Sequence, residues 1–212
     1  MTQETNLKEL ERKAWTSYFD DGILDITAGL FVLAFGIGMT THYTTLTALS
    51  WMVIFFFAAA KKSITLPRVG IVKFSPEREE RIKKEKLFYI VFFTITAFIG
   101  LGFFIASAVG IPHSIRTIVG ELALVSYELI IAVGLCFVAY WKQIRRFYAY
   151  AGFTLAVIVA GLLIDMPEVH PFTITGYQFF ATGIVILFTG LFVLARFLKK
   201  YPKREGEEYV AR

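Results

Sequence analysis

The stretch TIVGELALVSYELIIAVGLCFVAYW, residues 117–141, decides the fold class of this protein. It contains no lysine or arginine, and it exceeds the roughly 20 apolar residues that an α-helix needs to cross a bilayer. Two carboxylates, Glu121 and Glu128, nevertheless lie inside it. We therefore predict a transmembrane helix that carries acidic groups into the membrane.

The same pattern recurs along the whole chain, which is 56% hydrophobic. Soluble domains are about 45–50% apolar with glycine counted. Six segments have the composition of membrane spans, namely 22–40, 43–60, 87–110, 117–141, 147–165 and 175–197. We predict an all-α integral membrane protein, a six-transmembrane-helix bundle that passes the cell membrane many times.

The basic residues indicate the orientation of the bundle. Of the 22 lysines and arginines, 21 lie before the first segment, after the second, after the fourth, or at the end of the last and beyond it, and Arg116 stands alone on the other side. Cytoplasmic loops carry such an excess of positive charge, so both termini are predicted to be cytoplasmic. Because the charge lies beside the apolar segments, the net charge of +5 indicates contact with the lipid bilayer and not with nucleic acid.

Two regions outside the spans have patterns of their own. Residues 1–21 place apolar side chains at helical spacing between charged ones, which predicts an amphipathic interfacial helix, followed by the six-span membrane domain at 22–212. The segment 61–86 is a basic cytoplasmic loop. Within it, residues 63–74 alternate loosely and predict a short hairpin, and Ser75-Pro76 predicts the start of a helix that continues into the third span.

Basic side chains next to a membrane attract anionic lipids, at about 1 kcal/mol per charge near the surface. In the loop at 61–86, Arg68 and Lys73 are the candidates for this role. Binding of a soluble anionic ligand at the same two residues is the alternative.

A Thr-Gly pair occurs three times in the last segment, seven residues apart, so that Gly176, Gly183 and Gly190 share one helix face. Small residues let membrane helices approach closely. We predict a helix-packing seam, either within one chain or between the copies of a homo-oligomer. The stretches 27–36 and 188–197 look alike, but ten apolar residues do not establish an internal repeat.

Glu128 and Glu121 are the candidate transport or ion site. Glu128 falls near the middle of its predicted span and Glu121 near the outer end, and no basic residue lies at the depth of Glu128 in another span. Burial without a cation favours a protonated carboxyl, which is suited to carrying a proton or replacing part of a cation's hydration shell. The alternative is a neutral acid, hydrogen-bonded to Thr, Tyr or a carbonyl group in a packed interface.

Asp21 and Asp25 lie at the cytoplasmic end of the first span, one turn apart. They are explained by the helix dipole with a salt bridge to Arg68 or Lys73, or alternatively by an acidic cytoplasmic vestibule that gathers cations.

The three histidines, His42, His113 and His170, fall one in each predicted outer loop. Three His ligands would suit zinc or another transition metal, but three separate surface histidines explain the pattern more simply. The nucleotide, hydrolase and metalloprotease motifs are absent from the sequence. We therefore predict neither an enzyme nor a resident cofactor.

These observations favour a small transporter or channel for protons or cations that uses Glu128. The alternative is a non-transporting membrane scaffold, sensor or accessory subunit, which would act through the basic loop and the glycine-lined interface.

Overall fold

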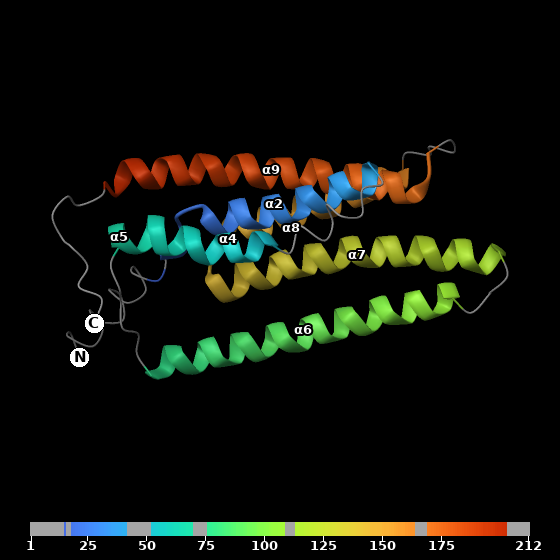
Figure 1. Ribbon diagram of the computed structural model, residues 1–212, viewed down its shortest axis with the longest axis horizontal. Coiled ribbons are helices and arrows are strands. Elements are labelled where there is room, and N and C mark those ends of the chain that lie inside the picture. Colours follow the sequence, from blue (N-terminus) through green and yellow to red (C-terminus); the bar gives the residue numbers. More distant parts are fainter. Residues whose placement is uncertain are drawn as a thin grey trace. The chain divides into compact units, whose positions relative to one another are not determined.

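The computed structural model describes residues 18–41, 52–69, 76–108, 113–163 and 169–202, together with Trp15. Within these residues the chain is helical and contains no strand (Figure 1), so the all-α prediction is confirmed. The elements in chain order are α2 (Ile23–Thr40), α4 (Val53–Ala60), the π-helix η2 (Lys61–Thr65), α5 (Leu66–Val69), α6 (Pro76–Ala108), α7 (His113–Lys142), α8 (Arg145–Leu163) and α9 (Pro171–Lys200).

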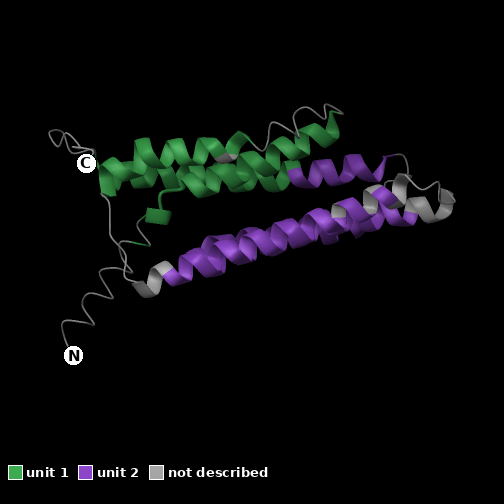
Figure 2. Ribbon diagram, turned by 60° about the horizontal axis from the view of Figure 1, so that its bottom comes forward, with its two compact units in different colours: residues 1–73, 180–212 green, residues 74–179 purple. Residues whose placement is uncertain are grey.

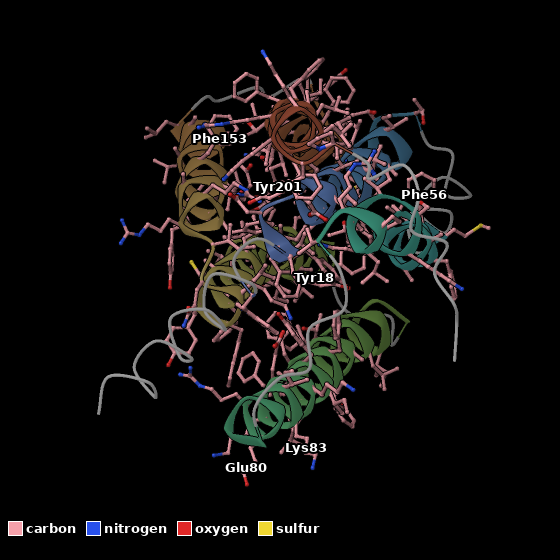
Figure 3. All side chains as sticks on the ribbon, turned by 90° about the vertical axis from the view of Figure 1, so that its left-hand side faces the viewer. Tyr18, Phe56, Glu80, Lys83, Phe153 and Tyr201 are labelled. Atoms are coloured by element: carbon pink, nitrogen blue, oxygen red, sulfur yellow. The ribbon has the colours of Figure 1, made fainter. Side chains whose placement is uncertain are left out.

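Four stretches of the described helices are long and apolar enough to cross a membrane. They are Ile23–Thr40, Ile118–Lys142, Arg145–Leu163 and Pro171–Lys200. These match the first, fourth, fifth and sixth segments predicted from the sequence. Large apolar side chains also face outward, for example Phe56, which is 62% exposed on α4 (Figure 3). Both findings support a membrane protein.

The region between the second and third predicted spans is more helical than the sequence suggests. α6 begins at Pro76, as predicted, and continues without a break to Ala108. The hairpin predicted at 63–74 is wrong for residues 63–69, which belong to η2 and α5. Strand preference depends strongly on context, and here Thr65 turns inward and donates a hydrogen bond to Asp21. Residues 70–74 lie outside the described residues.

The chain divides into two compact units (Figure 2). Unit 1 comprises residues 1–73 and 180–212, and unit 2 comprises residues 74–179. Unit 1 contains α2, α4, η2, α5 and the C-terminal part of α9. Unit 2 contains α6, α7, α8 and the first turns of α9.

In unit 1, α2 and α9 pack backbone against backbone. A Cβ added to Gly183 would lie 2.5 Å from the backbone nitrogen of Leu33, and one added to Gly29 would lie 2.6 Å from that of Leu187. These distances leave no room for a side chain, so glycine is required at both positions. The glycine ridge of α9 is therefore used within the chain at Gly183 and at Gly190.

The contacts between α2 and α9 are related by a local two-fold axis. Residues 22–35 (GILDITAGLFVLAF) and 183–196 (GIVILFTGLFVLAR) share GI and GLFVLA at matching positions. The contact of Gly183 with Leu33 has its counterpart in Gly22, whose added Cβ would lie 2.7 Å from the nitrogen of Leu194. The contact of Gly29 with Leu187 likewise has its counterpart in Gly190, whose added Cβ would lie 2.7 Å from the nitrogen of Ile26. The likeness that the sequence alone left undecided thus marks an antiparallel pair of similar helices.

In unit 2, aromatic and polar contacts join neighbouring helices. Phe88 of α6 packs on Phe137 of α7, with ring centroids 4.3 Å apart. Near the same end, Lys142 Nζ lies 2.6 Å from Glu85 Oε1. Gln178 of α9 donates through Nε2 to the carbonyl oxygen of Val157 in α8, at 3.2 Å. Interhelical hydrogen bonds of this kind stabilise packing in an apolar surrounding.

Candidate functional sites

Glu128 is a buried residue in the middle of α7, with 3% of its surface exposed. α7 buries one stripe, because Glu128, Ala132, Leu135 and Ala139 follow at spacings of three and four residues. The hydroxyl of Thr175, in the first turns of α9, is hydrogen-bonded to the Glu128 carboxyl. The structure therefore places a carboxylic acid and a hydroxyl together inside unit 2.

Glu121 is exposed and does not share this environment. It lies seven residues before Glu128, whereas α9 begins at Pro171, only four residues before Thr175. Both helices start at the same end of unit 2 (Figure 1). The face of α7 that carries the two glutamates therefore extends beyond the beginning of α9. The two glutamates differ in burial although they occupy similar helical positions.

The surroundings of Glu128 limit its chemistry. Among the described residues, Lys61 pairs with Asp21 and Lys142 pairs with Glu85, whereas Glu128 pairs with no described basic side chain. One carboxyl and one hydroxyl supply fewer oxygens than the six or more that Mg²⁺ or Ca²⁺ takes. Binding and release of a proton need only the carboxyl and its hydrogen-bond partner.

A second polar cluster lies in unit 1, at Asp21. Lys61 Nζ is 2.7 Å from Asp21 Oδ2, and the Thr65 hydroxyl donates to the same oxygen. The other carboxylate oxygen accepts the backbone N–H of Ile23 at 3.1 Å. Asp21 and Thr65 are fully buried, and Lys61 is 3% exposed. Gly22, with φ of 77°, makes the turn that brings Asp21 beside the start of α2.

Aromatic rings surround the Lys61 ammonium group. It lies 4.3 Å from the ring centroid of Tyr18, 5.0 Å from that of Phe19 and 5.7 Å from that of Phe57. It also donates to the backbone oxygen of Tyr18. We call Tyr18, Phe19, Phe57 and Asp21 the Lys61 cage. Burial, reinforced by the charge of Asp21, raises the pKa of Tyr18, so its ring stays neutral beside the cation.

The sequence anticipated the acidic residues of this cluster but not their partner. The expected partners of Asp21 were Arg68 and Lys73. Arg68 instead donates to the carbonyl oxygen of Ile64 at 2.7 Å, and Lys73 lies outside the described residues. Asp21 and Asp25 are both fully buried, so this conformation does not present them as an open vestibule. The spacing of Phe57, Lys61 and Thr65, four residues apart, was the available signal for an inward-facing lysine.

The remaining predicted site residues are dispersed. Gly176 is buried and belongs to unit 2, whereas the contacts of Gly183 and Gly190 with α2 belong to unit 1. His170 is exposed and its Nδ1 accepts the N–H of Phe172 at 3.2 Å, at the beginning of α9. His42 and the side chain of His113 lie outside the described residues. Within the described part of the chain, no three His, Cys, Asp or Glu side chains gather as a metal site would require.

The beginning of α6 presents a basic surface. Its exposed cations are Arg81, Lys83, Lys84 and Lys86. Figure 3 shows Glu80 and Lys83 projecting away from this helix. Glu85, between them, is buried and pairs with Lys142.

Comparison of the chain with protein-family models, with curated proteins and with solved structures finds no match. Function therefore has to be inferred from the side chains themselves.

Proposed function

We propose that the protein is a small transporter or channel of the cell membrane for protons or cations, with Glu128 as the intramembrane binding group. The observation that carries the proposal is the burial of Glu128 in α7 with the Thr175 hydroxyl as its hydrogen-bond partner. An ionisable side chain inside a membrane is costly to bury and usually marks a pathway. The few oxygen ligands at this site, one carboxyl and one hydroxyl, favour binding of a proton over binding of a metal cation.

The proposal includes six spans with both termini in the cytoplasm. α6 extends through most of the third predicted span and α4 through part of the second. The distribution of basic residues supports the orientation, and the exposed cations of α6 would then face anionic lipid headgroups.

In this proposal, Glu128 holds a proton as a neutral acid. It releases the proton when its O–H bond breaks and a water molecule that reaches the site accepts the proton. The Thr175 hydroxyl then donates to the carboxylate that remains. A hydrogen bond to a charged group contributes about 1.5–3 kcal/mol, which partly offsets the loss of solvation. The apolar surroundings favour rapid rebinding of a proton.

The test is proton flux in proteoliposomes that contain a pH-sensitive dye. We expect Glu128→Gln to fold normally and to lower the flux at least about 10-fold, because the amide cannot release a proton at neutral pH. Thr175→Val should lower it less, since the carboxyl is retained. Glu121→Gln is the matched control. Equal flux through wild-type protein and Glu128→Gln would contradict the proposal.

A non-transporting scaffold or accessory subunit is the second candidate. It is favoured by the complete burial of Glu128 in a hydrogen-bonded helix contact, which a purely structural acid would also show. In that case Glu128→Gln changes no flux, whereas replacing Lys83, Lys84 and Lys86 by Gln weakens binding to vesicles that contain anionic lipid. Such a protein would assemble as a homo-oligomer or with a partner through its exposed helix faces.

A further inference from the structure

The Lys61 ammonium group is enclosed entirely by its own chain. Asp21 supplies a carboxylate at 2.7 Å, the Tyr18 backbone supplies a carbonyl oxygen, and three aromatic rings lie within 5.7 Å. A buried charge is costly unless it is paired and hydrogen-bonded, and here each requirement is met. Aromatic cages of this kind are a known means of binding organic ammonium groups.

The cage joins two parts of the sequence. Tyr18, Phe19 and Asp21 precede α2, whereas Phe57 and Lys61 belong to the end of α4 and the start of η2. Trp15 is also buried, with its ring centroid 4.8 Å from that of Phe19. The segment before α2 is therefore attached to the α4 end through the ammonium group.

The π-helix η2 carries both side chains that reach one oxygen of Asp21. Lys61 and Thr65 are the first and last residues of η2, and both bind Asp21 Oδ2. π-helical turns are rare and frequently occur at functional sites. The π-helix therefore coincides with the contact to Asp21.

We propose that the Lys61 cage is an ammonium-binding site whose resident occupant is Lys61, and that its occupation latches the segment before α2 onto the end of α4. Primary alkylammonium ions are the class of ligand that fits when the lysine side chain is absent. The latch is independent of the proton site at Glu128, and it does not require that the protein transports anything.

The experiment measures access of acrylamide to Trp15 in the full-length protein in detergent micelles, with Trp51 and Trp141 replaced by Phe. Lys61→Ala should open the latch and increase Trp15 quenching several-fold, since a desolvated cation–aromatic contact and its ion pair shift such an equilibrium about 10-fold or more. Propylammonium, which replaces the missing atoms, should restore the protection. Lys62→Ala, which removes the exposed neighbouring lysine, is the matched control and should change nothing.

Two further results decide between a cage and a general charge effect. Sodium chloride at the same ionic strength should not restore protection in Lys61→Ala, and restoration by sodium would overturn the cage. Lys61→Met fills the space without a charge, so it should expose Trp15 and should not respond to propylammonium. Unchanged Trp15 quenching in Lys61→Ala would overturn the latch. If that variant does not fold, unchanged quenching in Lys61→Met would do so.

Discussion

Gly183→Ala tests the close contact between α2 and α9. The new methyl group would lie 2.5 Å from the nitrogen of Leu33 and 2.7 Å from its Cα, where ordinary contact begins at 3.4 Å. The obstacle is backbone, which cannot rotate away as a side chain can. The two helices must therefore separate by about 0.9 Å at this point, the difference between 3.4 Å and 2.5 Å.

The expected cost follows from that displacement. A gap of about 0.5–1 Å removes a quarter to a half of the dispersion attraction between the atoms concerned, and overpacking typically costs about 1–3 kcal/mol. Alanine gains about 1 kcal/mol of helix propensity over glycine. We therefore expect a net loss of about 1–2 kcal/mol for Gly183→Ala. Gly29→Ala should lose about as much, because an added Cβ there would lie 2.6 Å from the nitrogen of Leu187, nearly as close as the Cβ added to Gly183 lies to Leu33.

Thermal unfolding in detergent, followed by circular dichroism, measures the change. One kcal/mol corresponds to about 2–4 °C for a chain of this length. Gly152→Ala is the matched control, because an added Cβ there meets nothing within 4 Å. It should be neutral or slightly stabilising. If Gly183→Ala unfolds at the same temperature as Gly152→Ala, the close α2–α9 contact is refuted.

Two further perturbations address other buried polar contacts. Glu85→Gln should destabilise unit 2 by about 1–3 kcal/mol. This is at or below the roughly 3–5 kcal/mol of a fully buried pair, because the Lys142 side chain is 18% exposed. Adding Lys142→Met should recover part of that loss, measured by chemical unfolding. Tyr18 has a raised pKa in the folded protein, so above about pH 10 the unfolded chain loses the Tyr18 proton first and stability falls as pH rises. Tyr18→Phe should show a shallower fall between pH 9 and 11, and identical slopes would count against the burial of Tyr18.

Several features were predictable because they depend on local composition. A helix satisfies its own backbone groups, so an apolar segment of sufficient length becomes a membrane helix whatever its neighbours are. The segments 22–40, 117–141, 147–165 and 175–197 accordingly match helices that are able to span a membrane. The start of α6 at Pro76 could also be predicted from local sequence, since proline suits the first turn of a helix. The six-span count and the cytoplasmic termini stay predictions.

Other features required the tertiary structure, because they depend on which helix faces which. The hairpin predicted at 63–74 failed at 63–69, where contact of Thr65 with Asp21 outweighs a weak strand preference. Among the site residues, Glu128 and Glu121 lie seven residues apart on one helix, and the packing of the other helices buries the first and leaves the second exposed.

The sequence alone was enough to predict a helical membrane protein with acidic groups in its spans, since hydrophobic length and charge are properties of each segment alone. The tertiary structure decided the partners. In the structure, Lys61 is a buried cation, whereas the sequence placed it in a basic loop. Thr175 lies beside Glu128, and the two GLFVLA segments pair about a local two-fold axis. Such pairings depend on close approach between distant segments, and apolar composition does not encode which of many similar faces will meet.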